Sequence, residues 1–200
     1  MAVWTISAQP GTPGLEVAAE LAARAEIPLF DRKALEPIVH EFSPELGDLD
    51  DVEGRFGGRL NALALGLAMR FGPPEAFREF ELRRELPDLG RRVLGEVARH
   101  PAVILAAAAT SALADHPGAV HTRLWAPKEW RVAAYARTEI VDREKAAHEV
   151  AHAEHVERTW VDALVDVRVD DPTLYTLVVD ASRLAIDRIV GVLLAAGNAP

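Results

Sequence analysis

The segment from Gln9 to Gly14 is the first place where this sequence could do chemistry. It contains two glycines, two prolines and a threonine, and it stands between a β-rich apolar run and a helical pattern. A glycine-rich turn between a strand and a helix offers backbone N–H groups and the positive end of the helix dipole to an anion. We therefore take Gly11, Thr12 and Gly14 as candidate anion-binding residues; the alternative is a tight turn without a ligand.

A second set of candidate residues is His148, Glu149 and His152. Two histidines at positions i and i+4 of a helix can bind zinc, with the glutamate between them as general base, so this spacing would suit a zinc hydrolase. The apolar residues of the same segment, such as Ala146 and Val150, form a stripe that leaves the histidines on the opposite, wet face. We therefore predict no metal site here and keep the zinc hydrolase only as a third hypothesis.

The pattern of apolar runs predicts the strands and helices around these residues. Short runs typical of buried strands alternate with helical patterns, which predicts an α/β protein with a parallel sheet covered by helices on both faces. Ligands bind to such sheets at the carboxyl ends of the strands, where the loop at 9–14 would lie. The expected strands are Ala2–Ser7, Ile27–Phe30, Ala102–Leu105, Ala119–Trp125 and Tyr175–Val179.

Helical signals fill the intervals between these strands. Asp31 stands where an N-cap is expected, because an apolar helical pattern begins just after it. Further helices are expected over Leu89–Arg99 and Leu184–Ala196, and over Pro127–Leu164 with a break near Thr138–Asp142.

Composition limits the partners that the protein can have. The formal net charge is −9 and basic residues are interleaved with acids, which argues against binding to nucleic acid or to anionic lipid. The absence of cysteine excludes disulfides and thiolate metal sites. The N-terminus lacks the features of a signal peptide, and the longest apolar run, Pro101–Leu113, is too short to cross a bilayer. We expect an acidic, cytoplasmic protein with one domain over residues 1–200.

The order of several short motifs resembles that of the cytidylate kinase-like family of P-loop proteins. The run from Trp4 to Ala22 resembles the first strand, glycine loop and Leu-Ala helix of that family, and Ile27–Arg32 resembles its next motif. Leu124–Arg131 is similar to the strand that leads into an arginine-bearing lid. Asp171-Pro172 together with Tyr175–Leu184 is similar to the closing strand and turn.

This resemblance implies a three-layer P-loop NTPase or nucleotide kinase fold, with a five-stranded parallel sheet, a helical insert over roughly 43–99 and a helical lid over roughly 128–165. It also implies ATP with Mg²⁺ as cofactor and phosphoryl transfer to a nucleoside monophosphate such as CMP or dCMP. Gly11, Thr12, Gly14 and Glu16 would bind the nucleotide, and Arg131 and Arg158 would be the catalytic lid arginines. The alternative for these arginines is a solvated helix surface with i,i+4 ion pairs, such as Glu154 with Arg158.

Two positions depart from the family pattern. Leu15 stands where the loop cation is expected, and alanines at 106–109 follow the third strand where a phosphate-binding arginine is expected. A charge-assisted hydrogen bond contributes about 1.5–3 kcal/mol, which methyl groups cannot replace.

We therefore predict a degenerate member of the family, a weak nucleotide or anion binder or an interaction module with lost or much reduced kinase activity. An active nucleotide or small-molecule kinase that uses the lid arginines is the alternative. The apolar helical pattern at Leu60–Phe71 could form a homodimer contact or belong to the core.

Overall fold

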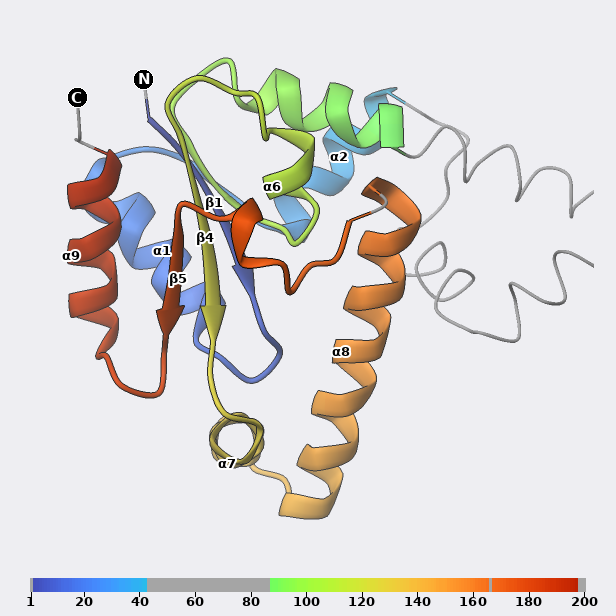
Figure 1. Ribbon diagram of the computed structural model, residues 1–200, viewed down its shortest axis with the longest axis vertical. Helices are drawn as coiled ribbons and strands as arrows, with labels where there is room; N and C mark the ends of the chain where they lie inside the picture. The colour runs from blue at the N-terminus through green and yellow to red at the C-terminus, as the bar shows by residue number, and fades with distance from the viewer. Residues whose placement is uncertain (1, 43–86, 166, 198–200) are drawn as a thin grey trace, which may run out of the picture.

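The computed structural model describes residues 2–42, 87–165 and 167–197 of the chain. Five parallel strands form a sheet in the order β2-β3-β1-β4-β5 (Figure 1). This arrangement confirms the predicted α/β fold with a five-stranded parallel sheet. The strands are β1 Val3–Ala8, β2 Leu29–Phe30, β3 Ala102–Leu105, β4 Ala119–Trp125 and β5 Leu177–Asp180.

Helices cover both faces of the sheet, as Figure 1 shows. Helices α1 and α9 share a core with one face, whereas α2, α6 and a helix over residues 87–97 share a core with the other. Asp31 caps α2 as expected, because its Oδ1 accepts a hydrogen bond from the backbone N–H of Ala34 at 3.0 Å. The helices are α1 Gly14–Ala25, α2 Arg32–Phe42, α6 Ala109–Ala112, α7 Lys128–Thr138, α8 Arg143–Val165 and α9 Ile186–Gly197.

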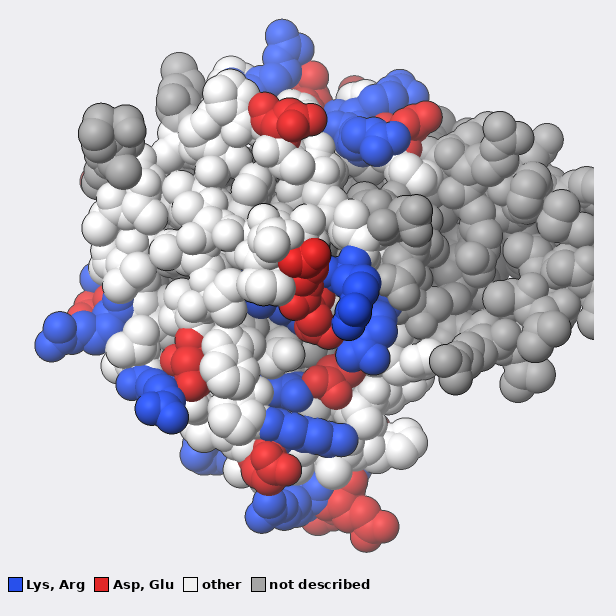
Figure 2. Space-filling model, viewed as in Figure 1, with Lys and Arg blue, Asp and Glu red and all other residues white. Residues whose placement is uncertain are grey.

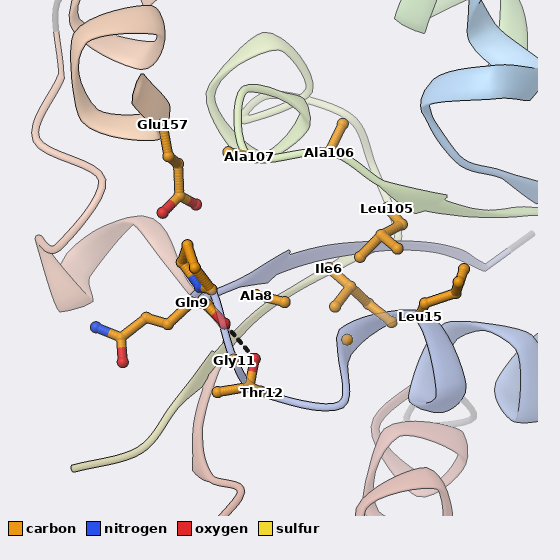
Figure 3. A pocket seen from close by; sticks show the side chains of 12 residues that line it. Ile6, Ala8, Gln9, Gly11, Thr12, Leu15, Leu105, Ala106, Ala107 and Glu157 are labelled. Atoms are coloured by element: carbon orange, nitrogen blue, oxygen red, sulfur yellow. Dashed lines mark hydrogen bonds between the residues drawn. The ribbon is translucent and has the colours of Figure 1, made fainter. Parts of the chain in front are cut away.

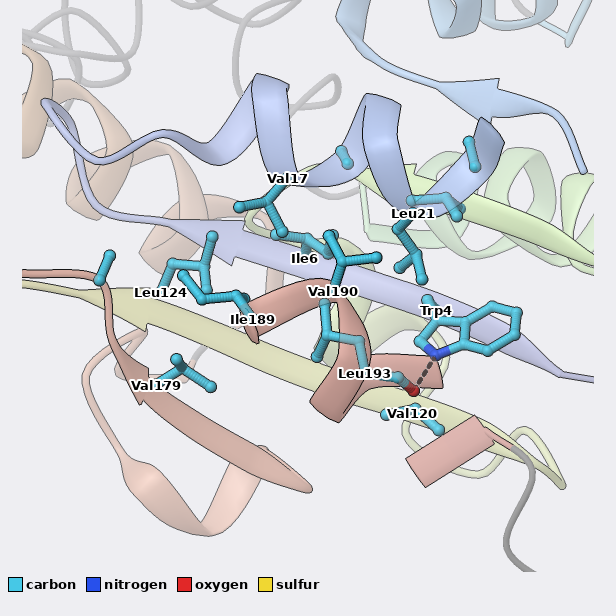
Figure 4. Packing of buried hydrophobic residues seen from close by; sticks show 14 residues of the cluster. Trp4, Ile6, Val17, Leu21, Val120, Leu124, Val179, Ile189, Val190 and Leu193 are labelled. Atoms are coloured by element: carbon cyan, nitrogen blue, oxygen red, sulfur yellow. Dashed lines mark hydrogen bonds between the residues drawn. The ribbon is translucent and has the colours of Figure 1, made fainter. Parts of the chain in front are cut away.

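The larger core lies between the sheet and helices α1 and α9 (Figure 4). Apolar side chains alternate along the central strands, so that Trp4 and Ile6 of β1 and Leu124 of β4 point to this side. The indole Nε1 of Trp4 donates a hydrogen bond to the carbonyl oxygen of Leu193 at 2.9 Å, which ties the first strand to the last helix.

The opposite face of the sheet changes character along the strands. At its amino end, Val3 packs with Ala102 and with apolar side chains of α2 and of the helix at 87–97. Toward the carboxyl ends the same face carries buried polar side chains, Thr5 and Ser7 from β1 and His121 and Arg123 from β4. Because the period of a strand is two residues, this face leads from an apolar core to a polar region beside the loop at 9–14.

Helices α7 and α8 correspond to the region expected to form the lid. They pack on each other through Val132, Ala146 and Val150, and Figure 1 shows α7 near the carboxyl end of β4 and α8 running alongside the sheet. The chain leaves the helical conformation at Glu139–Asp142, which confirms the break predicted near these residues.

Two other expectations concern the segment between α2 and β3. The helix found at 87–97 buries Val93, Leu94 and Val97 in the core of the domain. The rest of the expected insert, and the apolar pattern at 60–71 with its dimer hypothesis, lie outside the described residues. Within the described ranges, no helix has the length and the apolar character that a membrane span requires.

The face of the molecule in Figure 2 carries charges of both signs. Lysine and arginine groups lie beside aspartate and glutamate groups over the described part of this face. Ion pairs between oppositely charged side chains also occur at the surface, such as Arg183 with Asp180 and Arg158 with Asp170.

Candidate functional site

The loop at residues 9–14 connects the carboxyl end of β1 to the first turn of α1. Its backbone is fixed from within, because the N–H and the hydroxyl of Thr12 both donate to the carbonyl oxygen of Gln9, at 3.0 and 2.6 Å. The Gln9 side chain accepts from the backbone N–H of Ala126 at 3.1 Å, which joins the loop to the end of β4. The Thr12 hydroxyl, a candidate ligand for the nucleotide, therefore serves the turn itself.

Both glycines of the loop are required by close packing. Gly11 has a φ of +85°, and a Cβ on it would lie 2.7 Å from the carbonyl oxygen of Arg131. A Cβ on Gly14 would collide with the side chain of Ala8. The loop can therefore approach β1 and α7 closely only because these two positions lack side chains.

The loop borders a cavity of about 300 Å³ at the carboxyl edge of the sheet (Figure 3). Leu15 from α1, the residues that follow β3 and Glu157 from α8 form its other walls, and Leu15 is 53% exposed. Among the lining residues that the structure describes, Glu157 is the one charged side chain, and none is a lysine or an arginine. They are Ile6, Ala8, Gln9, Pro10, Gly11, Thr12, Gly14, Leu15, Leu105, Ala106, Ala107 and Glu157.

The predicted residues of the loop meet at this cavity in part. Gly11, Thr12 and Gly14 line it, and Leu15 and Ala107, the two apolar departures from the family pattern, lie on its wall. Glu16 is exposed and is absent from the lining. The N-terminus of α1 has no side-chain cap. The N–H of Gly14 donates to the carbonyl oxygen of Thr12 at 2.8 Å, so the N–H groups of Leu15 and Glu16 are the ones that the first turn offers to an anion.

Arg131, a predicted lid arginine, is 4% exposed and does not line the cavity. Its Nε donates to the carbonyl oxygen of Ala126 at 2.9 Å, and its Nη1 donates to that of Pro10 at 3.0 Å. Its Nη2 forms an ion pair with Glu154 at 2.6 Å. The three guanidinium nitrogens therefore join the glycine loop, the residue after β4 and α8.

Arg158, the second predicted lid arginine, has a side chain that is 62% exposed. Its Nη2 lies 3.5 Å from a carboxylate oxygen of Asp170, and it does not line the cavity. The i,i+4 pairing of Glu154 with Arg158 considered from the sequence is replaced by the pairing of Glu154 with Arg131. The two predicted catalytic arginines therefore have different carboxylate partners, and neither of them lines the cavity.

The residue that sequence reasoning missed is Arg123, which is 5% exposed. Its Nη1 donates to the hydroxyl of Ser7 at 2.6 Å and to Oε1 of Glu157 at 2.9 Å. Its Nη2 donates to Asp170 at 3.3 Å. A charged residue inside the apolar run Ala119–Trp125 was the available signal, because an arginine in a buried strand requires a partner.

Burial and the charge of the partner have opposite effects on the pKa values of Arg123 and Glu157. Burial is the largest effect on Glu157 and raises its pKa overall, although the charge and the hydrogen bond of Arg123 act in the opposite direction. Burial lowers the pKa of Arg123, but the carboxylates of Glu157 and Asp170 together with Tyr175 outweigh burial and raise it overall. The guanidinium therefore stays protonated, and its charge is neutralised inside the protein.

The histidines of the zinc hypothesis lie on the solvent side of α8. His148 and His152 are exposed with their rings stacked at 6.4 Å between centroids, while Ala146 and Val150 are buried. This placement confirms the predicted wet face. Nowhere in the described part of the chain do three or more metal-ligating side chains gather into a possible site.

The strand order 2-3-1-4-5, with a glycine loop between the central strand and its helix, defines a kinase-like P-loop fold. The sequence model of the Cytidylate kinase-like family matches residues 3–183. The chain therefore belongs to the cytidylate kinase-like family, as the order of its motifs predicted.

Several solved structures are similar to this chain. An uncharacterized protein from Eubacterium ventriosum has a TM-score of 0.69 at 16% identity, covering 97% of this chain and 96% of that chain. A gluconokinase from Sinorhizobium meliloti has a TM-score of 0.49 at 15% identity, covering 98% and 91%. A shikimate kinase from Bacteroides thetaiotaomicron has a TM-score of 0.48 at 13% identity, covering 98% and 96%. No curated protein matches the sequence.

Proposed function

We propose that this protein is a degenerate member of its family that binds a nucleotide or another small anion weakly and has lost most or all kinase activity. The observation that carries the proposal is the wall of the cavity beside the glycine loop. Leu15 occupies the position of the loop cation, Ala107 lies in the region of the expected phosphate-binding arginine, and the carboxylate of Glu157 faces the same space.

Phosphoryl transfer depends on positioning and on neutralisation of the negative charge that the transferred group carries. The N-terminus of α1 supplies a stabilisation of about 0.3–1 kcal/mol for an anion, which is the usual contribution of a helix dipole. Glu157 opposes it with a negative charge. These two terms support weak binding and poor catalysis.

The described residues around the loop do not fit the triphosphate of ATP with Mg²⁺. The Thr12 hydroxyl donates to Gln9, and the lining residues contain no cation to hold the β- and γ-phosphates. Metal ions and arginine or lysine side chains are the usual means of holding these groups. We therefore derive no catalytic step through ATP.

The alternative function is an active kinase for a nucleotide or a small molecule. Arg158 supports it, because this exposed arginine follows Glu157 on α8 and its ion pair with Asp170 is long, at 3.5 Å. A rearrangement of α8 could carry its guanidinium toward the cavity. Arg131 would have to leave three internal partners to do the same.

A coupled assay with Mg²⁺-ATP and CMP, dCMP or UMP separates the two functions. We expect turnover equal to that of a heat-inactivated sample, together with small thermal shifts at millimolar ATP, ADP or CMP. Turnover above the inactivated sample would overturn the proposal and favour the active kinase. The complete absence of a thermal shift with every nucleotide would remove the residual nucleotide site from both functions.

The substitution Leu15→Lys tests whether the loop still faces an anion. A cation restored at this position is expected to strengthen the binding of ATP by about tenfold, within the range of one charge-assisted hydrogen bond. Leu15→Met, which has similar length without charge, is the matched control. Equal affinities of the two variants in calorimetric titration would show that the loop does not hold phosphate.

A further inference from the structure

The ion pair between Arg123 and Glu157 joins the sheet to α8 directly beside the cavity. Arg123 comes from β4 and Glu157 from the middle of α8, and their nitrogen and oxygen atoms are 2.9 Å apart. Both side chains are shielded from solvent, with Arg123 almost fully buried. Glu157 alone of the two lines the cavity, and Figure 3 shows its carboxylate pointing toward the space above the loop.

A buried guanidinium requires an anionic partner, because an unpaired charge in the interior is strongly unfavourable. Ser7 contributes only a neutral hydroxyl, and Asp170 binds the other side of the guanidinium at the longer distance of 3.3 Å. Glu157 therefore supplies the closest counter-charge of Arg123. A phosphate group presents the same kind of oxygen acceptors to a guanidinium as a carboxylate does.

We propose that Arg123 is a latent phosphate-binding residue of this cavity and that Glu157 is its built-in counter-anion, which keeps phosphate groups out. A phosphate that entered beside Glu157 would meet a like charge, and Arg123 would be occupied. When the carboxylate of Glu157 is removed or moves away, a phosphate group takes its place on Arg123. This inference rests on the proposed function, since it assumes that the cavity is the place where an anion binds.

The same helix offers a matched control. Glu154, one turn before Glu157, pairs with the buried Arg131 at 2.6 Å. Neither Glu154 nor Arg131 lines the cavity, so the loss of this pair leaves a buried arginine without opening it to a ligand there. Both pairs join a glutamate of α8 to a buried arginine, and of the two glutamates Glu157 lines the cavity while Glu154 does not.

The experiment compares the full-length variants Glu157→Gln and Glu154→Gln with the unmodified protein. Inorganic phosphate and pyrophosphate are titrated by calorimetry and by thermal unfolding, with chloride at matched ionic strength as the reference. We expect Glu157→Gln to bind phosphate about tenfold more tightly than the unmodified protein, while Glu154→Gln shows no change. Adding Arg123→Gln to Glu157→Gln is expected to abolish the gain.

An unchanged affinity in Glu157→Gln, or an equal gain in Glu154→Gln, would overturn the inference. Should Glu157→Gln fold only when phosphate is present and not in chloride, phosphate would be acting as the missing counter-anion, which supports it. If Glu157→Gln folds in neither salt, Glu157→Asp is the variant to test. Its shorter side chain moves the carboxylate away from Arg123, and we expect the affinity for phosphate to rise about threefold. No gain in Glu157→Asp would then be the contradicting result.

The failure of this inference is distinguishable from failure of the proposed function. Nucleotide turnover by the unmodified protein would overturn the loss of activity, but it would not explain a phosphate gain confined to Glu157 variants. Conversely, the protein could be inactive while its Glu157 and Glu154 variants bind phosphate equally well. That result would support the proposed function and contradict the role proposed for Glu157.

Discussion

The conformation of the glycine loop depends on two residues that have no side chain. Gly11 and Gly14 let the chain pass close to Arg131 and Ala8, and no other residue could occupy these positions without displacement. Leu15, the next residue, adds an apolar surface to the cavity wall, and its side chain is about half exposed. The loop therefore presents backbone and an apolar side chain, rather than a cation, to the cavity.

The first prediction concerns Gly11. Gly11→Ala should lower the free energy of unfolding by about 1–3 kcal/mol, because alanine is strained at a φ of +85° and its Cβ would press on the backbone of Arg131. Denaturant unfolding measures the change. The control is Gly191→Ala in α9, where a Cβ meets no atom within 4 Å and a gain of up to about 1 kcal/mol is expected. Equal effects of the two substitutions would contradict the packing described for the loop.

At the scale of elements, the turn between α7 and α8 sets the direction of the helix that carries Glu154 and Glu157. The N–H of Val141 donates to the carbonyl oxygen of Ala136 at 3.1 Å, which closes the end of α7. Ile140 lies between them with a φ of +55°, a conformation that a β-branched residue adopts at a cost, and it is 92% exposed.

The second prediction follows from this strained position. Ile140→Gly should raise the stability of the protein by about 1 kcal/mol, because glycine adopts the left-handed conformation freely and little buried area is lost. Ile140→Ala, which removes the exposed side chain but keeps a Cβ, is the control and should gain less. Thermal unfolding of the three proteins measures the order, and a destabilised glycine variant would show that Ile140 contributes through packing instead.

At the scale of the whole molecule, a buried polar network crosses the sheet on the face shared with α2 and α6. The Thr5 hydroxyl is hydrogen-bonded to Nδ1 of His121 at 2.7 Å and to the hydroxyl of Thr110 at 3.2 Å. This network links β1 to α6 and to β4. Thr5 lies 105 positions before Thr110 and 116 positions before His121 in the sequence. Burial lowers the pKa of His121 below its ordinary value of 6.5, and the neighbouring His116 acts in the same direction.

The third prediction is a dependence of global stability on pH. A histidine with a lowered pKa in the folded state favours the neutral form, so its contribution is present above about pH 6.5 and is lost as the pH falls through the folded-state pKa. We expect the unfolding free energy to fall from pH 7.5 to about pH 5.5 less steeply in His121→Asn than in the unmodified protein. His152→Gln, on the exposed face of α8, should retain the original slope. Identical slopes for all three proteins would exclude titration of His121 as a cause.

Much of the fold could be predicted because it depends on local sequence. The boundaries of β3 and β4 match the apolar runs Ala102–Leu105 and Ala119–Trp125, and Asp31 caps α2 as its residue type suggests. The family could be predicted as well, since the order of its motifs survives even where their side chains have changed. The beginnings and ends of β1, β5 and α9 differ by one or two residues from those predicted.

The candidate site could be predicted only in part. Gly11, Thr12 and Gly14 line the cavity together with Leu15, as their place after the first strand indicated. Arg131, predicted as a lid arginine, has three internal partners, which come from the loop, from the residue after β4 and from α8. The sequence does not distinguish an arginine of a lid from an arginine that is bound by internal acceptors, since the distinction depends on which acceptors surround the guanidinium.

Residue types at short spacing predict the parallel sheet and the glycine loop, and they show that Leu15 follows the loop directly. The position of Glu157 at the cavity and its contact with Arg123 follow from tertiary packing alone. These two residues are 34 positions apart, and nothing in the period of a strand or a helix relates them. Their contact arises because α8 packs beside the carboxyl ends of the strands, where a buried arginine requires the nearest carboxylate.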